Sequence, residues 1–249
     1  MRLKKVNARG FSHDLVVVLF VAIFAVAGVG YLVASHADPI TANSSVIDVS
    51  WPQCEELGSI GYHRFGMVGV TGTKDAFSGN QCLSSMVHHF SQYSLYVVGN
   101  YPSKYCSDHN ISNAQKCGQN AASNALGHAS ITGVKNGAAG WWIDTEIPKP
   151  GSHQWGGNQA ANRAYLLGMW QVLASTGKTV GFYSTPSQWQ QITGGWRNNS
   201  PTWYATGKYS TTTPNIRGYC HQSFTRSSVK WVQYINTSHS GGIDIDIRC

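Results

Sequence analysis

Short apolar segments recur along the chain from residue 46 onward and alternate with longer amphipathic or polar stretches. The segments are rich in β-branched and aromatic residues and are bounded by Gly, Pro, Asn and Ser, which is typical of strands. The expected strands are Val46–Ser50, Gly66–Val70, Leu95–Gly99, Gly140–Asp144, Thr179–Ser184, Thr202–Ala205, Lys230–Tyr234 and Ile243–Ile247. Helical spacing predicts helices over Gln81–Tyr93, Asn113–Thr132, Gln159–Gly177 and Pro186–Ile192. Ser200–Ser228 is expected to be loop around a short strand. Eight strands alternating with helices predict an α/β fold of the (β/α)8 barrel type.

The longest apolar segment lies near the N-terminus. Residues 15–34 carry no charge and follow a basic stretch from Arg2 to Arg9. A segment of this length spans a bilayer as one helix, and its positive flank stays in the cytoplasm. We therefore expect a cytoplasmic basic segment at 1–14, a transmembrane anchor at 15–34, a linker at 35–45 and an exported barrel domain at 46–249. A signal sequence cleaved after Ser35-His36-Ala37 is the alternative, and it would make the domain secreted.

Composition and charge narrow the possible partners. Charged residues make up 12% of the chain, about half of the roughly 25% of an ordinary soluble domain. The net charge is +7, but the exported part has no run of basic residues, which disfavours nucleic-acid binding. A mildly basic surface suits an anionic glycan or a cell envelope.

All six cysteines lie in the expected exported part, at positions 54, 82, 106, 117, 220 and 249. No CxxC pair occurs, so zinc-ribbon and thioredoxin-like sites have little support. An even number in an oxidising compartment indicates disulfides. Proximity in the sequence predicts the pairs Cys54–Cys82, Cys106–Cys117 and Cys220–Cys249.

Carboxylates gather where three expected strands end, at Asp48, Asp144, Glu146, Asp244 and Asp246. A carboxylate beside an apolar strand is costly unless it is exposed or paired, and the carboxyl ends of barrel strands carry active sites. Asp144 and Glu146 point to the same side of an extended strand, with backbones roughly 6.6 Å apart. Glycoside hydrolysis uses carboxyl pairs about 5–9.5 Å apart, one protonated and one ionised. Helix capping, ion pairing and a Ca²⁺ or Mg²⁺ site are the alternatives; no EF-hand pattern occurs, and neither a metal nor a cofactor is expected.

Six short motifs in order resemble the family 25 glycoside hydrolases, the N-acetylmuramidase lysozymes. They are Asp48-Val49-Ser50, Asp144-Thr145-Glu146, Gly181-Phe182-Tyr183-Ser184, Trp203-Tyr204-Ala205, Gln233-Tyr234 and Ile243-Asp244-Ile245-Asp246. The resemblance covers Val46–Cys249 and implies an irregular (β/α)8 TIM-like barrel. Val98-Gly99-Asn100-Tyr101-Pro102 departs from the family's aromatic-His-aromatic pattern. The six cysteines and Trp51-Pro52-Gln53-Cys54 look more like a divergent, disulfide-containing bacterial branch.

The resemblance also implies roles for individual residues. Glu146 would be the general acid, with Asp144 and Asp48 as its ionised partners. Asp244 or Asp246 would complete an acidic floor, and Tyr183 would position the sugar amide. Further expected substrate-binding residues are Trp203, Gln233, Trp51, Trp142 and Asn100. Core packing is the alternative for Trp142.

These observations predict a membrane-anchored, extracytoplasmic glycoside hydrolase that cleaves peptidoglycan between N-acetylmuramic acid and N-acetylglucosamine. The alternative is a non-catalytic module on the same barrel that binds glycan or attaches to the envelope. A binding module does not need Asp48, Asp144 and Glu146 together, so the presence of all three favours the enzyme.

Overall fold

The computed structural model describes residues 45–72, 76–100, 106, 110–147, 155–156, 158–212, 214–237 and 243–249. The expected cytoplasmic segment 1–14, the anchor 15–34 and all of the linker except residue 45 lie outside these residues. Within the described ranges, no helix is long and apolar enough to cross a membrane. The anchor and the domain boundaries therefore stay predictions.

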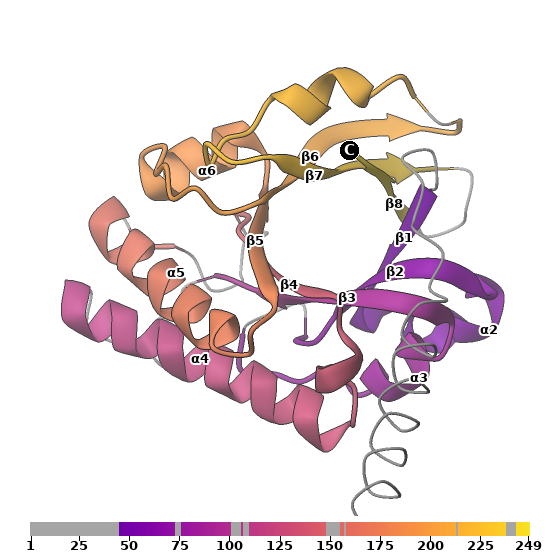
Figure 1. Cartoon of the computed structure of the whole chain (residues 1–249), viewed down its shortest axis with the longest axis horizontal. Coiled ribbons are helices and arrows are strands. Elements are labelled where there is room, and N and C mark those ends of the chain that lie inside the picture. The colour runs from indigo at the N-terminus through magenta and orange to yellow at the C-terminus, as the bar shows by residue number, and fades with distance from the viewer. Residues whose placement is uncertain are drawn as a thin grey trace, which may run out of the picture. The chain divides into compact units, whose positions relative to one another are not determined.

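Eight strands close a barrel in the order of the sequence (Figure 1). They are β1 (Ser45–Val49), β2 (His63–Gly69), β3 (Phe90–Val98), β4 (Gly140–Asp144), β5 (Thr179–Ser184), β6 (Thr202–Ser210), β7 (Val229–Asn236) and β8 (Ile243–Arg248). All eight expected strands are confirmed, with shifted ends for six of them. Strands β1 to β7 pair in parallel.

Strand β8 departs from the parallel arrangement, because it pairs antiparallel with both β7 and β1. Residues 237–242 are the whole connection between β7 and β8. A parallel crossover needs a dozen residues or more, so this connection can only return the chain in the opposite direction. The first residues of β8 consequently lie at the barrel end where the other strands finish.

Helices cover only part of the barrel. They are η1 (Trp51–Glu56), α2 (Leu57–Ile60), α3 (Leu83–Val87), α4 (Ile111–Ile131), η2 (Lys135–Gly137), α5 (Gln159–Ala174), α6 (Pro186–Thr193) and η3 (Arg217–His221). The helices expected near α4, α5 and α6 are confirmed. The helix expected over Gln81–Tyr93 is wrong after Val87, because Phe90 begins β3 and pairs with His63 of β2. The loop expected over Ser200–Ser228 contains a longer β6 and the short helix η3.

Helices α4 and α5 lie side by side on the outside of the barrel (Figure 1). Two glycines allow this close approach. A Cβ atom on Gly118 would collide with the backbone of Tyr165, and one on Gly168 would collide with the backbone of Gln115. The contact is therefore reciprocal, with each helix presenting a glycine to the backbone of the other.

A separate aromatic cluster fills the inside of the barrel. Its rings join strands that are not neighbours: Phe65 of β2 stacks on Trp231 of β7, and Trp142 of β4 meets Trp203 of β6 edge to face. Such contacts are possible only across the interior. Gly181 faces this space, and a Cβ atom there would collide with Trp142.

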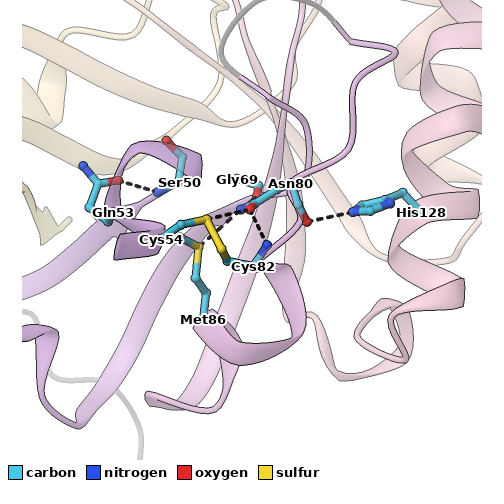
Figure 2. The surroundings of a disulfide bond; sticks show 8 residues. All are labelled: Ser50, Gln53, Cys54, Gly69, Asn80, Cys82, Met86 and His128. Atoms are coloured by element: carbon cyan, nitrogen blue, oxygen red, sulfur yellow. Dashed lines mark hydrogen bonds between the residues drawn. A yellow bond between two sulfur atoms is a disulfide. The ribbon is translucent and has the colours of Figure 1, made fainter. Parts of the chain in front are cut away.

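The three predicted disulfides are confirmed, with Cα–Cα distances of 5.7 Å for Cys54–Cys82, 5.9 Å for Cys106–Cys117 and 5.5 Å for Cys220–Cys249. The first bond joins η1, which follows β1, to the turn before α3. Figure 2 shows the fully buried Asn80 beside it. The Asn80 amide donates to the carbonyl of Gly69 (2.8 Å) and accepts from the backbone N–H of Cys82 (3.0 Å). This disulfide and Asn80 together hold the segment after β1 against β2.

Candidate active site

The strand register brings the polar residues together at one end of the barrel. Asp48 on β1 pairs with Asp244 on β8, and Asp144 on β4 pairs with Tyr183 on β5. Gln233 on β7 lies opposite Ala205 on β6. The antiparallel direction of β8 is what allows Asp244, near the start of its strand, to join residues near the ends of theirs.

These side chains line a pocket of about 90 Å³ in the mouth of the barrel. Its lining residues are Asp48, Tyr96, Asp144, Glu146, Tyr183, Trp203, Gln233 and Asp244. The pocket shares six of them with a wider groove of about 870 Å³. Among the other residues lining the groove are Trp51, Asn100, Thr185, Gln188 and Tyr209. A groove of this size can hold several sugar rings, with the carboxyl groups at its base.

A chain of two hydrogen bonds joins three of the pocket residues. The Tyr183 hydroxyl donates to Gln233 Oε1 at 2.6 Å, and Gln233 Nε2 donates to Asp48 Oδ2 at 2.9 Å. The first bond sets the orientation of the Gln233 amide, because its oxygen must face the tyrosine. Its nitrogen is then directed at Asp48.

Burial and mutual repulsion make protonation of the acids favourable. Burial raises the pKa of Glu146, the charge of Asp244 raises it further, and hydrogen bonding with Tyr183 opposes the rise. Burial also raises the pKa of Asp144, and the charges of Glu146 and Asp244 add to that rise. Burial raises the pKa of Asp244 to about 6. Among the described residues lining the pocket there is no Lys, Arg or His that would favour the ionised forms.

The pKa of Asp48 is raised by the same causes. Burial raises its pKa well above the usual range, and the charges of Asp246, Asp244 and Asp144 act in the same direction. The Tyr96 hydroxyl opposes them, because it hydrogen-bonds to the carboxylate. Four acids in one polar pocket, with raised pKa values, can supply both a proton donor and an anion.

Most of the expected site residues meet in this pocket or the groove. Glu146, Asp144, Asp48, Asp244, Tyr183, Trp203 and Gln233 line the pocket, and Trp51 and Asn100 line the groove. Trp51 is 48% exposed, as a residue that stacks on a ligand would be.

Two expected substrate-binding residues lie elsewhere. Trp142 is buried in the aromatic cluster inside the barrel and lines neither the pocket nor the groove. Asp246 is fully buried, and the indole N–H of Trp203 donates to its Oδ1 at 2.5 Å. Core packing, the alternative for Trp142, is therefore what the structure shows. The expectation that Asp246 contributes to the floor of the site is wrong, because it lies buried behind Trp203.

Sequence reasoning missed Tyr96 and Tyr209. Tyr96 lies inside an expected strand, two residues before Val98. Alternation therefore puts both side chains on the same face of β3, and both line the groove. Tyr209 fell in a stretch expected to be loop, whereas it pairs with Ile235 on an extension of β6 and is 71% exposed at the groove. The polar residues Thr206, Lys208 and Ser210 at every second position were the available signal.

Within the described ranges, no group of three or more His, Cys, Asp or Glu residues has an arrangement that could hold a metal ion.

Comparisons with known proteins agree with this geometry. Residues 76–234 match the model of a family described as lysozyme-like protein 1. A probable GH family 25 lysozyme 4 of Dictyostelium discoideum is 41% identical over 66 residues, which covers 26% of this chain and 29% of that relative. The chain thus matches less than a third of the length of this curated relative.

Two solved structures share the fold. The bacterial lysozyme of Streptomyces coelicolor superposes with a TM-score of 0.52 at 17% identity, over 84% of this chain and 93% of that one. The modular Cpl-1 endolysin, whose structure contains a peptidoglycan analogue, superposes with a TM-score of 0.51 at 17% identity. The match covers 84% of this chain and 55% of the endolysin.

Proposed function

Because the chain belongs to the lysozyme-like protein 1 family, we propose that its barrel is a glycoside hydrolase acting on peptidoglycan. The bond cleaved is the one between N-acetylmuramic acid and N-acetylglucosamine. One observation carries the proposal: Asp144 and Glu146, two residues apart at the end of β4, both line one polar pocket with raised pKa values. The peptidoglycan analogue bound by the Cpl-1 endolysin, which shares the fold, supports this substrate class.

Glu146 is the proton donor in this mechanism. Its raised pKa favours the protonated carboxyl group, which transfers its proton to the leaving glycosidic oxygen. Asp144 and Asp48 are the ionised partners in this mechanism and face the positive charge that develops on the sugar ring. Protonation of Glu146 favours the ionised form of Asp144, because the charge of Glu146 is one of the causes that raise the pKa of Asp144. Hydrogen bonds from Gln233 and Tyr96 favour the ionised form of Asp48. Asp244 completes the acidic wall of the pocket.

The remaining residues position the substrate. Tyr183 and Gln233 form the hydrogen-bonded chain to Asp48. The Tyr183 side chain also lines the pocket, where it can position the amide group of the sugar. Trp51 and Tyr209 line the groove with exposed aromatic rings, on which the apolar faces of sugars can stack. Trp203 and Asn100 complete the lining of the pocket and the groove respectively.

The proposed place of action is outside the cytoplasm. Three disulfides in the barrel fit an oxidising compartment. The uncharged segment 15–34 would then anchor the domain to the membrane, or direct its secretion if it is cleaved.

Replacing Glu146 with Gln tests the proton donor. Glu146→Gln keeps the size and polarity of the side chain but removes its proton, so release of sugar from peptidoglycan should fall by about 100-fold or more. The matched control is Glu55→Gln, at an exposed glutamate in η1. Glu55→Gln should unfold at the same urea concentration as the wild type, and Glu146→Gln should be at least as resistant above the ordinary glutamate pKa of about 4.3, because it replaces a buried acid with a raised pKa. Turnover by Glu146→Gln at the wild-type rate would remove Glu146 from this role.

The pH dependence tests the electrostatics of the same residue. Because Glu146 must be protonated, turnover should fall as pH rises through its raised pKa. The charge of Asp244 contributes to that rise. Asp244→Asn should therefore move the alkaline limb of the pH–rate profile to lower pH, whatever its effect on the maximal rate. An alkaline limb that stays in place would contradict the assignment.

A glycan-binding module without catalysis is the second candidate. The exposed rings of Trp51 and Tyr209 along a wide groove favour it, since stacking alone binds glycans. Sedimentation with purified sacculi separates the two functions. A binding module would sediment with sacculi and release no sugar, and its binding would not change in Glu146→Gln.

A further inference from the structure

Asp246 is a buried acid for which the proposed mechanism has no use. It has no exposed surface and lines neither the pocket nor the groove. Its Oδ1 accepts the hydrogen bond from the Trp203 indole N–H. Its Oδ2 is buried and has no hydrogen-bond partner among the described residues. An ionised carboxylate left in this condition would be costly.

Asp48 is a neighbour of Asp246 and also has a buried carboxylate oxygen without a hydrogen-bond partner among the described residues. In the antiparallel register of β1 and β8, Val46 pairs with Asp246 and Asp48 pairs with Asp244, so Asp48 and Asp246 are diagonal neighbours. Diagonal neighbours on one face of a sheet lie about 7–8 Å apart, and the charge of Asp246 is among the causes that raise the pKa of Asp48. Asp48 Oδ2 accepts from Gln233, whereas Asp48 Oδ1 is buried and has no hydrogen-bond partner among the described residues.

The charges around this pair favour one shared proton. The charge of Asp244 on β8 raises the pKa of Asp246, and the charge of Asp246 in turn raises the pKa of Asp48 on β1. The neighbours on β6 and β7, Trp203 and Gln233, are neutral. No Lys, Arg or His is found among the described residues that line the adjoining pocket. Two buried carboxylates without a counter-ion titrate as a pair and keep one proton to a higher pH than either would alone.

The surroundings also indicate which residue holds that proton. Asp48 is partly exposed to the pocket and accepts hydrogen bonds from both Gln233 and Tyr96. Asp246 is completely buried and accepts a single one, from Trp203. The anion is better stabilised at Asp48, so the proton belongs on Asp246.

We propose that Asp246 is a neutral carboxylic acid in the folded protein and that its Oδ2–H donates to Oδ1 of Asp48. Asp246 is then a positioning residue: it leaves Asp48 ionised beside the pocket and holds the Trp203 ring on the pocket wall. Burial raises the pKa of Asp246 well above its usual range, although the Trp203 hydrogen bond acts in the opposite direction. The benefit to catalysis rests on the proposed function, whereas the protonation state does not.

Asp246→Asn in the full chain, with its disulfides formed, tests the proposal without an activity assay. Asparagine retains an acceptor for Trp203 and offers a donor to Asp48. A group with a raised pKa in the folded state stabilises the protein fully below its unfolded pKa of about 3.9, and this stabilisation is lost as pH rises towards the folded pKa. The wild type should therefore lose urea resistance relative to Asp246→Asn as pH rises above about 4 towards the raised pKa of Asp246 in the folded state.

The opposite trend would overturn the proposal. If Asp246 were ionised and bound as an anion by Trp203, Asp246→Asn would become steadily less stable than the wild type over the same pH range. Failure of Asp246→Asn to fold would also contradict the proposal, because a neutral isostere should replace a neutral acid.

Infrared spectroscopy provides a second readout. Well above the ordinary aspartate pKa of about 3.9, the wild type should still show the C=O stretch of a protonated carboxylic acid, and this absorption should decrease in Asp246→Asn. Glu55→Gln is the control: this exposed glutamate of η1 lies outside the pair and the pocket, so its replacement should leave the band in place. An unchanged band in Asp246→Asn would show that Asp246 carries no proton. These results do not depend on whether peptidoglycan is cleaved.

Discussion

Among single residues, Gln233 does the most to organise the pocket. Its side chain is buried, accepts from Tyr183 and donates to Asp48. An amide is the side chain that can do both in one fixed orientation, and a carboxylate there would add a further negative charge.

Gln233→Met should remove both hydrogen bonds at nearly constant volume. The free energy of unfolding should fall by about 1–3 kcal/mol, because the Tyr183 hydroxyl and Asp48 Oδ2 lose their partners in a buried place. Urea denaturation measures the change, with Gln81→Met at an exposed position as the control. Equal midpoints for the two variants would mean that water replaces the Gln233 amide.

At this scale the sequence predicted which acids gather but not how deep each lies. Asp144 and Glu146 were expected to face the same way because alternation on a strand has a period of two. The same rule places Asp244 and Asp246 on one face. It cannot tell that Asp244 reaches the pocket while Asp246 is buried beside Trp203, since depth depends on the tilt and closure of the barrel.

Among the elements, the packing of α4 against α5 depends on the close approach of their backbones at Gly118 and Gly168. Gly118→Ala and Gly168→Ala each place a methyl group against the backbone of the other helix, so each should lower the free energy of unfolding by about 1–3 kcal/mol or more. Gly127→Ala is the control on α4, because a Cβ atom there meets nothing within 4 Å. That variant should be slightly stabilised, by about 0.5–1 kcal/mol, through helix propensity. Equal thermal stability of all three variants would contradict the packing.

Elements with clear boundary signals were predictable, and those decided by tertiary pairing were not. Helix α6 starts at Pro186 after the Thr185 N-cap and ends at Gly194 in a left-handed conformation, all of which is visible in the sequence. Phe90 to Tyr93 has ambiguous local spacing and becomes a strand because β2 offers it a partner. The reversal of β8 follows from the short connection after β7, which the alternating pattern alone did not indicate.

For the whole molecule, the scarcity of charge is the most informative property. With 12% charged residues, five acids at strand ends had to be either paired or functional. The structure brings four of them into one pocket without a basic partner among the described lining residues. The overall fold was predictable because strand number, order and disulfide pairing follow from local patterns. The groove was not, because it is built from loops and from the extension of β6 that carries Tyr209.

Identification of the sugar at newly formed reducing ends tests the central claim most directly. The full chain, with its disulfides formed, would be incubated with purified peptidoglycan and the products reduced and analysed by mass spectrometry. We expect N-acetylmuramic acid at the new reducing ends, and no new ends with Glu146→Gln. Reducing ends carrying N-acetylglucosamine would assign the barrel to another glycosidic bond. The absence of any new ends from the folded wild type would contradict hydrolysis.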